Sequence, residues 1–94
     1  MYYFLKESTR KGKKYSITLP DNKIVHFGAI GYEDYTMHHD DKRKDRYISR
    51  HKKEDWTDLS KAGTWSRYIL WNKKTLNSSI DDMEDRFDIK IKLL

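Results

Sequence analysis

The strongest folding signal lies in residues 14–27, where apolar and polar side chains alternate on both sides of a short turn. Every second residue is apolar before the turn, at Tyr15, Ile17 and Leu19. This period of two is typical of a strand with one buried face. Pro20, Asp21 and Asn22 are turn residues, and a β-branched, apolar run follows over residues 24–27. The pattern therefore predicts a β-hairpin.

The rest of the chain adds strands at both ends and helices between them. Residues 1–5 and 89–93 have strand character, and a loop is expected from Gly28 through Thr36. Helices are predicted for residues 40–53, 64–71 and 80–87, capped in the first case by Asp40 or Asp41 and in the last by Ser78 or Ser79. We expect one α+β domain over residues 1–94. Two or three helices would pack on a small antiparallel sheet, and a basic mobile loop would span about residues 7–13.

The aromatic residues favour a folded domain over a disordered chain. Hydrophobic residues make up 36% of the sequence and charged residues 37%, a balance that would favour disorder if rings were rare. The chain has 7 Tyr, 3 Phe and 3 Trp, and each ring can bury roughly 150–250 Å². A small, ring-rich core is therefore expected.

Several classes of site and location are disfavoured by what the sequence lacks. With no cysteine, the chain has no disulfide, thiolate zinc site or cysteine nucleophile. The first residues form too short an apolar run for a signal peptide, and no stretch approaches 18 apolar residues. We expect a soluble protein with no membrane partner.

Positive charge is concentrated near the N-terminus. The net charge is +5, and residues 1–31 carry six basic and two acidic side chains. The run Arg10, Lys11, Lys13 and Lys14 favours polyanions, of which phosphate backbones are the commonest. The alternative is a solvated loop whose charges serve solubility.

A second set of candidate residues follows the predicted helix over residues 40–53. Arg43, Tyr47, Arg50 and His51 fall on one flank at helical spacing, near Arg46 and Lys53. Arg and Tyr suit backbone phosphates and stacked bases, and Trp56 could also stack. Alternatively, Arg50 pairs inward with Asp34 or Asp40.

The next helix offers fewer candidates for binding. Trp65, Tyr68 and Trp71, at spacings of three, are expected to be core residues rather than a stacking surface. Ser66 and Arg67 are expected to be free to meet a partner.

Histidines and carboxylates in the middle of the chain suggest a polar network. The candidates are His26, Asp34, His38, Asp40 and His51. Such side chains can ligate zinc or iron, or act as general base and phosphate site in a nuclease. No catalytic or cofactor motif accompanies them. We therefore interpret them as structural, with no metal and no cofactor.

Four short phrases carry a resemblance to a known group of proteins: residues 26–28 (His-Phe-Gly), 34–36 (Asp-Tyr-Thr), 47–51 (Tyr-Ile-Ser-Arg-His) and 65–72 (Trp-Ser-Arg-Tyr-Ile-Leu-Trp-Asn). Over roughly residues 14–80, the chain resembles an uncharacterised family of small proteins from large double-stranded DNA viruses of eukaryotes. The resemblance implies a viral origin. We accordingly expect a location inside an infected host cell, with packaging in the virion as an alternative. It implies no activity, and no residue inherits a role from it.

The expected function is that of a small, basic, non-enzymatic viral accessory or virion protein. It would bind nucleic acid, DNA in preference to RNA, mainly through phosphate contacts. The residues expected to bind are Arg10, Lys11, Lys13, Lys14, Arg43, Arg46, Tyr47, Arg50 and Lys53. One alternative is a protein-interaction module, such as a minor capsid or assembly component, with a viral structural protein or a second copy as partner. The less favoured alternative is a metal-dependent nuclease.

Overall fold

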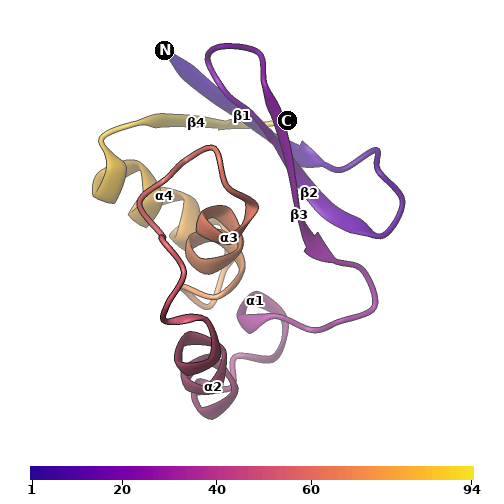
Figure 1. The fold of residues 1–94 in the computed structure, drawn as a ribbon, viewed down its shortest axis with the longest axis vertical. Coiled ribbons are helices and arrows are strands. Elements are labelled where there is room, and N and C mark those ends of the chain that lie inside the picture. The colour runs from indigo at the N-terminus through magenta and orange to yellow at the C-terminus, as the bar shows by residue number, and fades with distance from the viewer.

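A four-stranded sheet forms one layer of the protein, and the helices pack along one of its sides (Figure 1). The computed structural model describes residues 1–94. The sheet has the strand order β3-β2-β1-β4, with β1 (Tyr2–Glu7), β2 (Lys13–Thr18), β3 (Ile24–Ala29) and β4 (Lys90–Leu93). The helical elements are α1 (Tyr35–His38), α2 (Asp41–His51), α3 (Ala62–Trp65), the π-helix η1 (Ser66–Leu70) and α4 (Leu76–Phe87). The α+β prediction is confirmed.

The hairpin is formed by β2 and β3 as the alternation predicts. Tyr15 lies opposite Phe27, and Ile17 lies opposite Val25. Ile17 and Phe27 are almost completely buried. The turn between the strands is closed by a hydrogen bond from the Leu19 amide to the Lys23 carbonyl.

The connection from β1 to β2 is shorter than the basic loop expected over about residues 7–13. Both strands extend into that segment and leave only residues 8–12 between them.

The sheet is mixed, whereas an all-antiparallel sheet was expected. β4 runs parallel to β1, with Tyr2 opposite Lys90 and Leu5 opposite Leu93. Parallel neighbours need a crossover connection, usually through a helix, and α4 leads directly into β4 here. The alternating residues 89–93 predict a strand correctly, but strand direction depends on where the preceding helix packs.

The helices differ from the sequence prediction mainly at their boundaries. Asp40 caps α2 by accepting hydrogen bonds from the amides of Lys42 and Arg43, as predicted, but the helix ends at His51. α4 begins at Leu76 and is capped by Thr75, so the prediction of a Ser78 or Ser79 cap was wrong.

Two stretches take a different form from the one predicted. Residues 35–38 form the single turn α1, capped by the Asp34 carboxylate, where a loop was expected. The helix expected over residues 64–71 is divided into α3 and η1. In η1 the Trp71 amide donates to the Ser66 carbonyl, a π-helical spacing of five residues.

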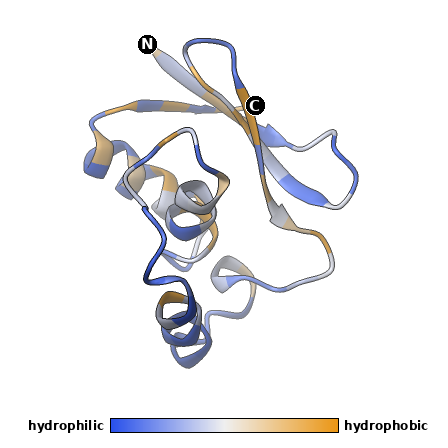
Figure 2. Cartoon of the chain, viewed as in Figure 1, coloured by the Kyte–Doolittle hydropathy of each residue, from blue (hydrophilic) through white to orange (hydrophobic).

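The apolar core lies between the sheet and the segment α3 to α4. Trp65 and Phe27 are its largest members, with ring centroids 6.3 Å apart. The Trp65 indole N–H donates to the Leu59 carbonyl, which satisfies the one polar atom of this buried ring. No residue of α2 belongs to the core cluster, and Figure 2 shows α2 as predominantly hydrophilic. α2 must therefore be held by other contacts.

The two faces of the sheet have different environments. Odd-numbered strand residues, such as Leu5, Ile17 and Ile91, point into the core. Most even-numbered residues point the opposite way because side chains alternate along a strand; Gly28, at the end of β3, instead lies against Leu70. Figure 1 shows α3 and α4 on the core side of the sheet and no helix on the other side.

Gly28 provides a test of the contact between β3 and η1. Its φ is +80°, and an added Cβ would lie 2.8 Å from Leu70 Cδ1 and 3.1 Å from Lys14 Cβ. Gly12 has a similar φ of +84° but open space around it. Gly28→Ala should therefore lower the free energy of unfolding by about 1–3 kcal/mol more than Gly12→Ala. Urea denaturation of both variants measures the difference, and equal losses would contradict the packing described.

Candidate functional site

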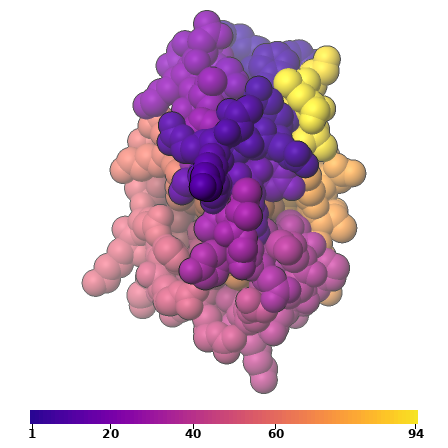
Figure 3. All heavy atoms as spheres, turned by 90° about the vertical axis from the view of Figure 1, so that its right-hand side faces the viewer, coloured from indigo at the N-terminus to yellow at the C-terminus, as the bar shows by residue number.

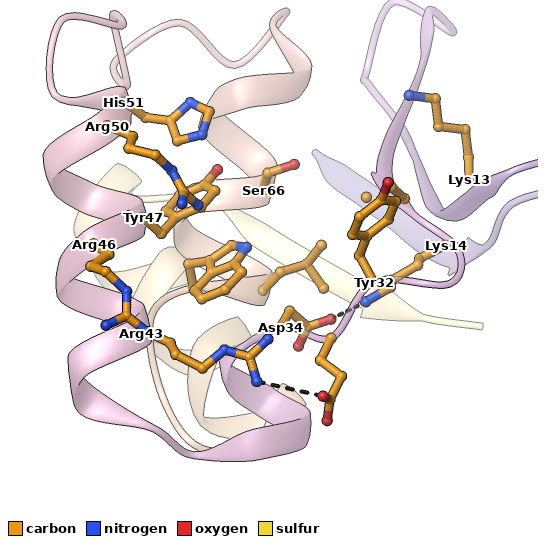
Figure 4. Close-up of a pocket in the computed structure, with 15 residues that line it drawn as sticks. Lys13, Lys14, Tyr32, Asp34, Arg43, Arg46, Tyr47, Arg50, His51 and Ser66 are labelled. Carbon is orange, nitrogen blue, oxygen red and sulfur yellow. Dashed lines mark hydrogen bonds and ion pairs between the residues drawn. The ribbon is translucent and has the colours of Figure 1, made fainter.

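A groove separates α2 from the ends of β2 and β3 (Figure 4). Its volume is about 440 Å³. Most of the charged side chains around it are basic, and three aromatic rings contribute to its walls. The lining comprises Lys13, Lys14, Gly28, Ala29, Tyr32, Glu33, Asp34, Arg43, Arg46, Tyr47, Arg50, His51, Ser66, Leu70 and Trp71.

One wall of the groove is the flank of α2 that the helical spacing indicated. Figure 4 shows Arg43, Arg46 and Arg50 following one another along this helix. The guanidinium of Arg43 lies 3.4 Å from the carboxylate of Glu33. Arg46 and Arg50 are exposed and form no ion pair or side-chain hydrogen bond. The alternative in which Arg50 pairs inward with Asp34 or Asp40 is therefore not found in the structure.

The opposite wall carries two neighbouring lysines in different states. Lys14 Nζ lies 2.5 Å from Asp34 Oδ2, and the exposed fractions of the two side chains are 15% and 3%. Asp34 also accepts hydrogen bonds from the amide and hydroxyl of Thr36. Lys13 forms no ion pair. Lys13 is thus the available cation on this wall, whereas the charge of Lys14 is already compensated.

α2 packs against the rest of the protein through a stack of aromatic rings. Tyr47 lies parallel to Trp71, with ring centroids 4.5 Å apart and planes inclined by 4°. The imidazole of His51 lies 4.3 Å from the Tyr47 ring. Because Tyr47 is only 9% exposed, it is a wall of the groove rather than a free stacking side chain. Burial raises the pKa of its hydroxyl to about 12.

A lysine completes the attachment of α2. Lys44 Nζ donates to the Asn72 carbonyl at 2.6 Å and lies 4.7 Å from the centre of the Tyr35 ring. The buried Asn72 side chain donates in turn to the carboxylate of Asp82 on α4. Partial burial lowers the pKa of Lys44. α2 is therefore joined to the core by aromatic and polar contacts.

The π-helix supplies groove residues that sequence analysis did not assign to the site. Ser66 and Leu70 belong to η1 and Trp71 follows it, and all three line the groove. π-helical turns often occur at functional sites. No spacing in the sequence distinguishes this π-helix from an ordinary helical turn.

Arg67 is not a free surface side chain, contrary to the sequence prediction. It is partly buried, and its Nη1 donates to the Trp71 carbonyl at 2.7 Å. Its guanidinium also lies over the rings of Trp56 and Tyr68. These contacts show that Arg67 serves packing, and that the Trp56 ring is covered by a cation of the same chain.

The predicted polar network is divided into separate local contacts. Asp34 binds Lys14, His38 accepts from the Asp40 amide, and His51 contacts Glu54. His26 lies on the sheet, hydrogen-bonded to the Ser8 hydroxyl. No three or more His, Asp or Glu side chains are gathered where they could hold a metal ion. The structure therefore offers no assembled metal site in support of the nuclease interpretation.

The remaining predicted basic residues lie outside the groove lining. Arg10 and Lys11 are exposed in the turn between β1 and β2, and Lys53 is exposed just beyond α2. In Figure 3 the indigo N-terminal part of the chain lies above the pink helical part, and a purple segment after β3 bridges the two.

Partial burial lowers the pKa of His26, and the charges of Arg10, Lys13 and Lys6 lower it further.

None of the helices has the length and apolarity required to cross a membrane.

A family comparison covers residues 4–51 and matches a family of unknown function, DUF5754. This segment is just over half of the 94-residue chain. The chain belongs to this family. The matched segment runs from β1 to the end of α2, so it includes Lys13 and the arginines of α2. Neither the curated proteins nor the solved structures contain a match to the chain.

The two lysines of β2 give a matched test of the buried ion pair. Lys14→Met leaves the Asp34 carboxylate buried without its cation, so it should lower the free energy of unfolding by about 3 kcal/mol. Lys13→Met removes the same charge from an unpaired side chain and should change stability by less than about 0.5 kcal/mol. Urea denaturation at neutral pH compares them. Similar effects of both substitutions would contradict the assignment.

Burial of Tyr47 predicts a loss of stability in alkaline solution. Above its ordinary pKa of 10.0, the tyrosine of the unfolded chain loses its proton, whereas the folded protein retains it up to about pH 12. Stability present below pH 10 should therefore fall across this interval, by up to about 2 kcal/mol from this residue.

Tyr47→Phe isolates this contribution from those of the other tyrosines. Unfolding at about pH 9 and about pH 11 should show a smaller alkaline loss in Tyr47→Phe than in the unmodified protein. An equal loss in both proteins would show that Tyr47 ionises normally.

Proposed function

We propose that this protein binds nucleic acid through phosphate contacts in the groove between α2 and β2. One observation carries the proposal: Arg46 and Arg50 on one wall and Lys13 on the other are cations without ion pairs. Guanidinium groups bind phosphate with two parallel hydrogen bonds, and lysine binds it as a point charge. Such contacts position a nucleic acid without reading its sequence.

The charge inside the groove also favours a polyanion. Its two carboxylates, Glu33 and Asp34, are each paired with a cation, so the unpaired charges are positive. A cleft lined by one sign of charge attracts ligands of the opposite sign and accelerates their association. Arg10 and Lys11 extend the positive charge beyond the groove, on the turn before β2.

We infer that this nucleic-acid-binding protein is a non-enzymatic viral accessory or virion protein. The resemblance of four sequence phrases to small proteins of large double-stranded DNA viruses supports a viral origin. A viral origin would place the protein inside an infected host cell, with packaging in the virion as a further part of the proposal. A double-stranded DNA genome would make DNA the preferred ligand over RNA. The expected binding has little sequence preference.

A second candidate function is favoured by apolar side chains beside the groove. Ile30, Tyr32 and Met37 are 62%, 74% and 58% exposed, and exposed apolar groups near arginines are typical of protein interfaces. A viral structural protein or a second copy of the chain would then occupy this side of the molecule. Self-association without nucleic-acid binding would support this alternative.

Replacing the two unpaired arginines tests the proposed function. Arg46→Gln/Arg50→Gln should weaken binding to a labelled duplex about tenfold or more at low salt, because two phosphate contacts are lost. The slope of log affinity against log salt should become shallower by about 2. A duplex of about 15 base pairs is suitable, since the longest dimension of the protein is 36 Å.

The control has the same net charge change on another part of the surface. Lys73→Gln/Lys74→Gln replaces two exposed cations that do not line the groove. It should leave most of the affinity and the salt slope in place. Equal losses in both double variants would mean that net charge, and not the groove, governs binding.

A further inference from the structure

The face of the sheet opposite the core carries exposed aromatic rings that the groove does not use. Tyr2 and Phe4 occupy successive outward positions of β1 and are 51% and 38% exposed. Their ring centroids are 6.3 Å apart, and the planes are inclined by 31°. Figure 1 shows no helix over this side of the sheet. Two neighbouring rings therefore lie open to solvent.

Lysines surround these rings on the same face. Lys90 and Lys92 of β4 lie directly opposite Tyr2 and Phe4 in the parallel register, and Lys6 follows them on β1. Lys90 Nζ lies 5.9 Å from the centre of the Tyr2 ring. None of the three lysines forms an ion pair.

No carboxylate lies among the outward-facing residues of the sheet. Apart from the rings and lysines already named, these positions are occupied by Ser16, Thr18, Ile24 and His26, of which Ser16 is buried, whereas Lys14 and Gly28 line the groove at the other end of the strands. The face therefore combines two exposed rings with side-chain charges that are all positive. We name it the ring face.

We propose that the ring face binds single-stranded nucleic acid, with successive bases stacked on Tyr2 and Phe4 and the backbone phosphates near Lys6, Lys90 and Lys92. Proteins that bind single strands combine aromatic rings with cationic tracks in this way. A four-stranded sheet that presents stacked rings is also an established form of RNA recognition. In a duplex the base faces are covered by their neighbours, so stacking on the rings favours single strands.

Charge argues against a second copy of this chain as the occupant. In a two-fold dimer the same patch meets itself, so the lysines of one ring face would lie against those of the other. With a net charge of +5 per chain, such an arrangement would be repulsive at low salt. A polyanion relieves the repulsion that a second copy would create.

This inference rests on the proposed function in one respect, the preference for nucleic acid, but it concerns a different surface. The groove is lined by residues of α2, η1 and the ends of β2 and β3, and it includes neither ring. The groove supplies phosphate contacts that any duplex can use. The ring face would add selectivity for unpaired bases.

The test measures binding of labelled oligo(dT) of about 15 nucleotides and of a duplex of similar length to the full chain at low salt. Tyr2→Leu/Phe4→Leu removes both rings and keeps apolar side chains. It should weaken oligo(dT) binding about tenfold or more while duplex binding changes little. Tyr2→Phe retains the ring and should bind oligo(dT) like the unmodified protein.

Ile24→Ala provides the matched control, since Ile24 is an exposed apolar residue of the same face at 52% exposure. It should not affect oligo(dT) binding if stacking is responsible. The proposal is overturned if the ring variant binds oligo(dT) normally, if it loses duplex and oligo(dT) binding equally, or if Ile24→Ala has the same effect. Ring-dependent self-association without oligo(dT) binding would identify a second copy as the occupant instead.

The two proposals can fail separately. Duplex binding that depends on Arg46 and Arg50, with oligo(dT) binding unaffected by the rings, would leave the groove function in place and remove the ring face. Ring-dependent oligo(dT) binding in a protein that does not bind duplex would support the ring face and remove the groove function. Thermal unfolding of each variant confirms that the substitutions leave the fold intact.

Discussion

The position of α2 depends on the stack of Tyr47 against Trp71, and the groove exists only because α2 is held there. α2 contributes no residue to the apolar core cluster, and Tyr47 is its one buried side chain. A stacked aromatic pair contributes about 0.5–1.5 kcal/mol beyond the area that it buries, and the bond from Lys44 to the Asn72 carbonyl fixes the helix at a second point. Together these contacts turn the arginine flank toward β2.

Neighbouring charges in this protein have different roles because their burial differs. Lys14 and Asp34 are withdrawn from solvent and compensate each other, so they connect β2 to the start of α1 and have little charge left for a ligand. Lys13, one residue earlier, has no such partner. In the sequence all the basic residues from Arg10 to Lys14 look alike, and only the fold separates structural from available cations.

Local patterns in the sequence predicted local structure well. Alternation predicted the hairpin, a carboxylate before a polar run predicted the Asp40 cap, and helical spacing placed Arg43, Tyr47 and Arg50 on one flank. The features that were missed depend on distant residues. Asp34 pairs with Lys14 twenty positions away, and β4 runs parallel to β1 after the crossover through α4. Neighbouring residues in the chain contain no information on such pairings.

The hydrophilic character of α2 has a consequence for how sequences of this fold can vary. Since the core is built from the strands and from residues 65–91, most surface positions of α2 can change charge without altering apolar packing. The contacts that hold the helix involve mainly Tyr47, Lys44, the Asp40 cap and Asp41, which accepts a hydrogen bond from the Tyr35 hydroxyl. Exposed positions such as Arg46 and Arg50 are open to selection for a ligand. Members of the family could therefore acquire different affinities by substitutions in a single helix, while the scaffold beneath it stays constant.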